Sequence, residues 1–258
     1  MRRSHAPFVR AELYGEGEPA LDDPAELFHE ASKLYPALAF RQAAGMARLG
    51  VSDELQEVST RATRRNTQLP SHPLPRPLRP RCSLWTALDA RRSRREFGGP
   101  LDRHRLATLL DAGYGVRRRD RRTVPSGGAL YPLELYLLEH GVFRYDPELH
   151  ALEEHDDADP WSAFVAACPV PEVASGAAAV ILVLAVFGRS RFKYGQRGYR
   201  FAVLEAGHVV QNVVLAAAAL DIAALPFGGF YDAKIDALVG ADGVEESVLY
   251  GVVLGGPR

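Results

Sequence analysis

The chain combines one long apolar stretch of helical spacing with several short apolar runs. Residues 200–220 (RFAVLEAGHVVQNVVLAAAAL) are apolar on almost every side and predict a long helix that is buried on most faces. Burial inside a dimer is one good way to achieve this. The short runs predict strands at 133–139, 142–146, 180–187 and 247–255, with His140 and Gly141 as the turn between the first two. Long helices with a few strands indicate an α+β fold.

Two shorter helices are predicted before the first strand. The segment 83–93 (SLWTALDARRS) has Leu84 and Leu88 on one helical face. Asp102 is the predicted N-cap of a helix over 103–113. This helix has leucines at core spacing and a glycine near its end: Leu106, Leu109, Leu110 and Gly113.

The first 80 residues differ in texture from the rest. Asp23 before Pro24 predicts the start of a helix that continues through 25–35. Five prolines in 70–80 predict an extended, semi-rigid connector, with a strap on the surface of the domain or of a partner subunit as the alternative. We therefore expect a helical extension with its connector at 1–80 and the main domain at 81–258.

Composition excludes several classes of protein. The net charge of −1 over 258 residues gives no reason to expect nucleic acid or an anionic membrane as partner. Cys82 and Cys168 form no CxxC motif and indicate a reducing compartment. No apolar stretch follows the N-terminal charges, and the most apolar window, 177–187, is too short to span a bilayer. We expect a soluble cytoplasmic protein.

An arginine-rich segment is the first candidate site. Arg91, Arg92, Ser93 and Arg95 offer guanidinium groups and a hydroxyl that can bind a phosphate. On a helix end, the first and last of these arginines would point the same way. A solvated basic helix end is the competing interpretation.

Two glycine-bearing segments could approach a planar ligand closely. Pro125, Ser126, Gly127 and Gly128 stand directly before the strand at 133–139. The second segment follows the long helix and contains Leu225, Pro226, Gly228 and Gly229. A plain turn and a helix stop, respectively, would look similar.

Polar residues interrupt the long helix and the segment before it. Glu205, His208, Gln211 and Asn212 make one polar stripe, which either is satisfied at a subunit interface or faces a ligand. Before the helix, Lys193 and Tyr194 lie in a predicted loop and could transfer a proton if desolvated, although a surface loop is the simpler interpretation.

Other motifs are missing or ambiguous. The histidines show no HxxxH or HExxH pairing, and we expect no metal site. The run 117–122 (RRRDRR) predicts a solvated loop, with a docking patch for an acidic peptide as the alternative.

Together and in this order, these motifs resemble the nitroreductase superfamily, and within it the FMN dehydrogenases that oxidise thiazolines and oxazolines in azole-containing peptides. The match covers roughly residues 82–258, with FHEASKLYP (28–36) also typical of this subgroup. The blocks FHEASKLYP, RRSRREF, PSGG, KYG and PFGG are individually weak, but five blocks in the right order are specific.

The resemblance implies roles for particular residues. It implies FMN binding by the arginine-rich segment, by both glycine-bearing segments and by Gln211, with Arg258 as a candidate for the phosphate. It implies Lys193 and Tyr194 as catalytic residues. The implied fold is an antiparallel-rich sheet flanked by helices, in a homodimer with FMN at the subunit interface.

The implied substrate is an azoline ring in a ribosomally made peptide, with a cyclodehydratase as a possible partner. Two alternatives remain open from the sequence. One is a general flavin reductase that uses a nicotinamide to reduce nitroaromatics or enones. The other is a flavin-free peptide-binding subunit of a modification complex.

Overall fold

The computed structural model describes residues 24–33, 69–117, 121–156 and 158–257. The chain divides into two compact units, 1–42 and 43–258. In the first unit the described element is helix α2, Pro24–Ala31. It begins at the predicted proline but ends earlier than expected, since Ser32 already lies in a turn. Asp23, its predicted start signal, lies outside the described residues.

The second unit is built on a seven-stranded sheet in which every pairing is antiparallel. Its strands are β1 (Ser71–Pro73), β2 (Leu133–Leu138), β3 (Val142–Asp146), β4 (Ala151–Asp156), β5 (Ala179–Val186), β6 (Ala223–Phe227) and β7 (Glu246–Gly255). Their order across the sheet is β1-β4-β3-β2-β5-β7-β6.

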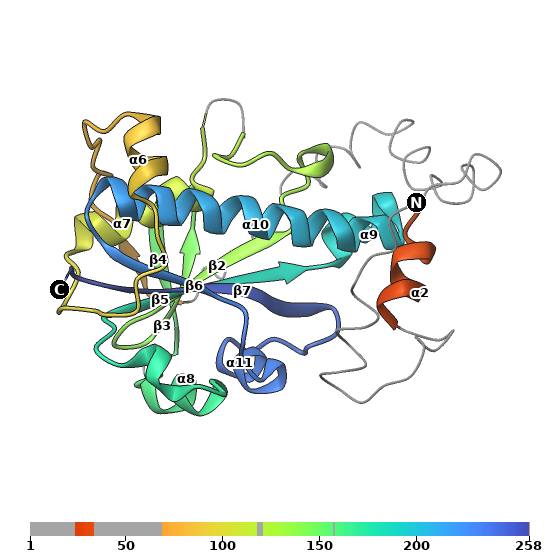
Figure 1. The fold of residues 1–258 in the computed structure, drawn as a ribbon. Coiled ribbons are helices and arrows are strands. Elements are labelled where there is room, and N and C mark those ends of the chain that lie inside the picture. The colour runs from red at the N-terminus through yellow and green to blue at the C-terminus, as the bar shows by residue number, and fades with distance from the viewer. Residues whose placement is uncertain (1–23, 34–68, 118–120, 157, 258) are drawn as a thin grey trace, which may run out of the picture. The chain divides into compact units, whose positions relative to one another are not determined.

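Helices cover both faces of this sheet (Figure 1). One face carries α6 (Leu84–Ala90), α7 (Arg103–Tyr114) and α10 (Gln196–Ala219), with α9 (Gly188–Tyr194) leading into α10. The other face carries α8 (Trp161–Ala167) and α11 (Asp232–Leu238). Two short 3-10 helices, η3 (Gly127–Ala129) and η4 (Pro171–Ala174), complete the described elements. The predicted α+β class and the antiparallel sheet flanked by helices are confirmed.

Strand β5 shows why the core has two halves. Its side chains alternate, so Ile181 and Val183 join the core cluster under α7 and α10, while Leu182 and Leu184 join the cluster under α8 and α11. Because both faces are covered, the strand reads as one continuous apolar run rather than as an alternating pattern.

The four predicted strands and the long helix are confirmed, with ends shifted by a few residues. The helix begins at Gln196 instead of 200, after Gly195 at a φ of 56°. Strand β4 was not predicted because its sequence, ALEEHD, is mostly polar. Strand β6 was not predicted because its sequence, AALPF, is short and contains a proline. Asp102 is the N-cap of α7 as predicted, and its side chain accepts a hydrogen bond from the Arg105 amide.

The proline-rich segment lies along the domain as a strap. Residues 71–73 form β1 beside β4, and the Leu78 amide donates to the Thr108 hydroxyl on α7. The predicted domain boundary at residue 80 stays a prediction. Strands β1 and β6 are the two edges of the sheet, and each contains a proline, Pro73 and Pro226.

Helices α7 and α10 approach each other closely at a glycine. A Cβ on Gly113 would lie 2.8 Å from Cγ2 of Val213, which is closer than real contacts allow. The glycine therefore fixes the separation at which α7 packs on α10.

A network of four charged side chains is buried on the α8 and α11 side of the sheet. Arg144 on β3 donates to Glu134 on β2 at 2.9 Å and to Glu153 on β4. Arg189 on α9 donates to the other oxygen of Glu134. The network ties α9 to three strands, and its members compensate one another's charge.

We predict that Arg144→Met lowers the free energy of unfolding by about 3–5 kcal/mol, because it removes the cation that pairs with buried Glu153 and leaves Glu134 with Arg189 alone. Arg105→Met, which removes an arginine of an exposed ion pair with Asp102, should cost less than about 1 kcal/mol. Urea unfolding followed by circular dichroism measures both. Equal losses in the two variants would contradict the compensation described for the buried network.

Candidate active site

The arginine-rich segment is extended, which corrects the prediction of a helix end. Helix α6 stops at Ala90, and Arg91 has a φ of −63° and a ψ of 119°. Arg91 and Arg95 therefore do not converge through helical spacing. Instead the backbone is fixed to the sheet, because the Arg94 amide donates to the Ala224 carbonyl at 2.9 Å and its guanidinium pairs with Asp221.

The remaining side chains of the segment are available to a ligand. Within the described residues, Arg91, Arg92 and Arg95 make no ion pair. Arg92 and Arg94 line a cavity of about 180 Å³ together with Val214 and Ala218 of α10. Three cationic side chains without carboxylate partners fit a phosphate group.

The loop before β2 has a strained backbone. Gly128, Ala129 and Tyr131 all have positive φ, at 67°, 54° and 44°. Residues other than glycine adopt this region at a cost of about 1–3 kcal/mol, so the surrounding contacts must hold them there. One such contact is the hydrogen bond from the Tyr131 amide to the Ser126 hydroxyl at 2.9 Å.

Lys193 and Tyr194 lie against this loop. They are the last residues of α9, not part of a loop as predicted, and both are half-buried. A Cβ on Gly128 would lie 2.5 Å from Tyr194 Oη and 2.8 Å from Lys193 Nζ. Gly127 similarly lies against the ring of Phe201, which packs edge-on to Tyr194 with ring centroids 5.0 Å apart. The structure thus brings two separately predicted segments together.

A buried carboxyl group lies behind the loop. Glu205 of α10 is 2% exposed, and its Oε1 accepts a hydrogen bond of 2.6 Å from the Tyr114 hydroxyl. Burial raises the pKa of Glu205 to about 7, although hydrogen bonding from Ser126 and Tyr114 and the charge of Arg122 lower it. Burial and the neighbouring Glu205 together raise the pKa of Tyr114 well above its ordinary value.

The second glycine-bearing segment begins as a strand rather than a loop. Leu225 and Pro226 belong to β6, and the side chain of Leu225 lies in the core on the α8 and α11 side. Gly228 and Gly229 follow the strand and are exposed, with no atom within 4 Å of a Cβ placed on Gly229. This open space allows a ligand to approach the backbone.

The polar stripe of the long helix divides into two. Glu205 points inward, and Asn212 donates to the Thr123 carbonyl at 3.3 Å. His208 and Gln211 are exposed on the outer side of α10. Arg258, the remaining predicted cofactor ligand, lies outside the described residues.

Two groups of predicted site residues lie at opposite ends of α10. The arginine-rich segment lies near Ala218, whereas the loop at Gly127 lies against Phe201. Seventeen residues of helix separate these contacts, which corresponds to about 25 Å along the axis. A single chain therefore does not bring the two groups to one ligand.

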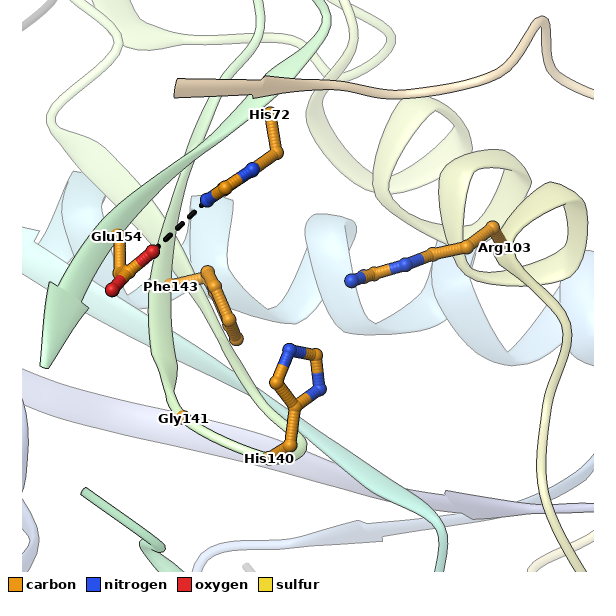
Figure 2. Close-up of a pocket in the computed structure, with 6 residues that line it drawn as sticks. All are labelled: His72, Arg103, His140, Gly141, Phe143 and Glu154. Atoms are coloured by element: carbon orange, nitrogen blue, oxygen red, sulfur yellow. Dashed lines mark hydrogen bonds and ion pairs between the residues drawn. The ribbon is translucent and has the colours of Figure 1, made fainter. Parts of the chain in front are cut away.

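A separate small pocket of about 150 Å³ lies at the β1 edge of the sheet. Figure 2 shows His72 reaching toward Glu154, with Nε2 and Oε2 3.0 Å apart. Arg103 and His140 line the other side and both approach Glu139. Each charged or titratable side chain of the lining has an ion-pair partner, either within the pocket or at Glu139. Across the described ranges, no group of three or more His, Cys, Asp or Glu side chains could hold a metal ion.

Helix α10 is long and apolar enough to cross a membrane by length and composition alone. The core helix of a soluble protein meets the same criterion. Here Ala202, Val209 and Val213 are buried in the core on the sheet.

Several residues of the site had no signal of their own in the sequence. Phe201 is one helical turn before Glu205, so the two face the loop together, but nothing marked Phe201 as different from its apolar neighbours. Tyr114 and Arg122 come from other segments and reach the site only through the tertiary fold. Arg122 lies over the Tyr114 ring, 4.2 Å from its centroid.

Comparison with known proteins identifies the class. The sequence pattern of the Nitroreductase family matches residues 88–256. The chain belongs to the nitroreductase family.

Two relatives and one solved structure refine the comparison. The chain is 38% identical over 161 residues to a protein of Methanocaldococcus jannaschii named as a nitroreductase, covering 59% of this chain and 81% of that one. It is 32% identical over 127 residues to the microcin B17-processing protein McbC of Escherichia coli, covering 45% of this chain and 47% of McbC. A chain of the E. coli microcin synthetase McbBCD complex, solved with truncated pro-MccB17 bound, has the same fold with a TM-score of 0.57 at 21% identity, covering 100% of this chain and 98% of that one.

We predict that the stability of the protein falls between about pH 4.5 and pH 7 through Glu205. The folded-state pKa of about 7 lies above the ordinary value of 4.5, so the folded protein keeps a proton that the unfolded chain has lost. The contribution present below pH 4.5 is about 3 kcal/mol and is lost as the pH rises through 7.

Glu205→Gln should remove this part of the pH dependence, as measured by urea midpoints at several pH values. Glu154→Gln, at the far edge of the sheet, should leave it unchanged. Parallel stability profiles for the wild type and Glu205→Gln would refute the prediction.

Proposed function

We propose that the protein is an FMN-dependent dehydrogenase that oxidises thiazoline or oxazoline rings in a ribosomally made peptide to thiazoles or oxazoles. The observation that supports this proposal most directly is the position of Lys193 and Tyr194. Their polar ends lie against Gly128, in the loop that the family resemblance assigns to flavin contact. A general flavin reductase does not need this pair. The similarity to McbC supports the peptide-modifying subgroup.

The chain's own residues fit FMN. Three arginines without ion pairs in the described part of the chain suit the phosphate, and the open backbone at Gly229 suits a planar ring. Members of the nitroreductase family typically bind FMN. Bound FMN would supply the two-electron oxidation of the substrate ring.

Lys193 or Tyr194 removes the proton that the azoline ring loses. The two side chains are half-buried, and Phe201 excludes water from one side of Tyr194. Because Gly127 and Gly128 have no side chains, the Phe201 ring, Tyr194 Oη and Lys193 Nζ can lie directly against the backbone of this loop. Loss of a proton and a hydride makes the ring aromatic, which supplies the driving force.

We further propose a homodimer in which each site takes its arginine-rich segment from one subunit and its loop, Lys193 and Tyr194 from the other. A two-fold axis across the middle of α10 places the C-terminal end of one helix beside the N-terminal end of its partner. The outer side of α10 exposes Val203 and Leu204, and α6 exposes Leu84 and Trp85. A second subunit would bury these apolar side chains.

The substrate of such an enzyme must first be cyclised. A cyclodehydratase is therefore the expected partner, and the McbBCD complex, with its bound pro-peptide, is consistent with such an assembly. We place the reaction in the cytoplasm, where an unmodified ribosomal peptide is available.

We predict that Lys193→Ala and Tyr194→Phe slow azoline oxidation by about 10²–10⁴-fold for whichever residue is the base, since positioned proton transfer contributes this much. Mass spectrometry of an azoline-containing peptide measures the loss of two hydrogens per ring. Lys234→Ala, a lysine on α11 that donates to the Ala166 carbonyl, is the matched control with unchanged rate.

The flavin absorbance of each variant must match that of the wild type. If Lys193→Ala and Tyr194→Phe each oxidise the azoline ring at the wild-type rate, neither residue is the base, and the catalytic assignment of the pair is refuted. Turnover of NADPH with a nitroaromatic, without azoline oxidation by the wild type, would identify a general flavin reductase. Purified protein that is colourless and cannot be reconstituted with FMN would identify the flavin-free subunit.

Mixing two inactive variants tests the shared site. Subunit exchange between Arg91→Ala/Arg92→Ala and Lys193→Ala should restore about a quarter of the wild-type activity, because half of the dimers are mixed and each has one intact site. Each variant alone should stay inactive. A mixture that also stays inactive, although exchange is shown by mass, would mean that each site is built within one chain.

A further inference from the structure

One complete and one partial chain of hydrogen bonds run from the strained loop toward Glu205. In the first, the Leu133 amide donates to the Tyr114 hydroxyl, which donates to Glu205 Oε1. The second is partial: the Tyr131 amide donates to the Ser126 hydroxyl oxygen, and Ser126 lies close enough to Glu205 to lower its pKa. One carboxyl group on α10 thus acts on both ends of the segment 126–133.

The second oxygen of this carboxyl is not satisfied. Glu205 Oε2 is buried and makes no hydrogen bond of standard geometry within the described part of the chain. Tyr114 donates to Oε1, and Ser126 is the other hydroxyl that acts on this carboxyl group. A buried acceptor without a full partner costs about 1–3 kcal/mol, which favours either a small loop movement or a proton on this oxygen.

We infer that Glu205 is a positioning residue whose proton decides whether Ser126 offers a hydrogen-bond donor or an acceptor to the flavin ring. The inference rests on the proposed FMN site. Ser126 is only half-buried, so its hydroxyl can also reach a ligand. Glu205 itself stays behind the loop and acts through Ser126.

The hydrogen-bond donors and acceptors of Glu205 and Ser126 determine which protonation state of Glu205 binds FMN more tightly. Ionised Glu205 only accepts, so the Ser126 hydrogen turns toward it and a ligand meets lone pairs. Protonated Glu205 donates to the Ser126 oxygen, which frees the Ser126 hydrogen for the ligand. The isoalloxazine ring offers more acceptors than donors at its polar edge, so the protonated state binds the flavin more tightly.

The groups around Glu205 allow this proton to move near neutral pH. Burial raises the pKa of Glu205 to about 7. The charged and titratable groups that act on it are Tyr114 from α7 and Arg122 from the segment that precedes the loop. The pKa of Tyr114 is raised well above its ordinary value, so this hydroxyl keeps its proton at neutral pH.

FMN binding to the apoprotein tests the inference through the quenching of flavin fluorescence between about pH 6 and pH 8. As the pH rises from about 6 to about 8, we expect the FMN affinity of the wild type to fall about 3–10-fold more than that of Glu205→Gln. The glutamine amide donates to Ser126 at every pH, and therefore this variant keeps the tighter state. Ser126→Ala should bind weakly and lack the same extra pH dependence.

The flavin phosphate itself titrates near pH 6 and changes the affinity for every variant. The pH dependence of FMN affinity in each variant is therefore compared with that of the wild type. Asp236→Asn is the matched control. Asp236 is another buried acid with a raised pKa, but it accepts a hydrogen bond from the Val248 amide far from the loop. Its substitution should leave the wild-type pH dependence intact.

The outcomes separate this inference from the proposed function. Wild-type protein that binds no FMN at any pH contradicts both. FMN binding whose pH dependence is the same in the wild type and Glu205→Gln overturns the role of Glu205 alone. If Glu205→Gln does not fold, Ser126→Ala decides, because a pH dependence equal to that of the wild type overturns the inference.

Discussion

The packing of α10 on the sheet is the constraint from which most of this structure follows. The inner side of the helix supplies Ala202, Val209 and Val213 to the core, and Gly113 lets α7 approach it closely. Because the helix is long and held along its length, it works as a rigid spacer between two groups of functional side chains. The arginine-rich segment is fixed near one end through Asp221, and the loop is fixed near the other end through Phe201.

Buried charge supports the same arrangement from the opposite side of the sheet. Arg189 is one helical turn before Lys193, and its ion pair with Glu134 fixes the rotation of α9 about its axis. Glu134 stands at the start of β2, directly after the strained loop. This ion pair joins β2 to α9 close to the place where Lys193 lies against Gly128.

Much of this architecture follows from local sequence patterns. The run AVILVLAV predicts a buried strand, and Asp102 predicts the N-cap of the helix that begins after it, as the structure has them. Strand β4 could not be predicted, because its acidic residues read as surface until Arg144 is placed opposite Glu153. The arginine-rich segment was wrongly predicted as a helix end for a similar reason. Its extended backbone depends on a hydrogen bond to Ala224, which is far along the chain. The roles assigned to the site residues stay predictions.

The prolines at the two edges of the sheet restrict how a peptide can be recognised. A sheet edge normally offers a row of free amides and carbonyls to which an extended peptide can add as a further strand. Here Pro73 and Pro226 each remove an amide from an edge strand, and Arg94 already occupies the Ala224 carbonyl on β6. Neither edge is a good template for backbone pairing. Under the proposed function, a peptide substrate would be held mainly through its side chains and the ring to be oxidised, which leaves its backbone free to move from one ring to the next.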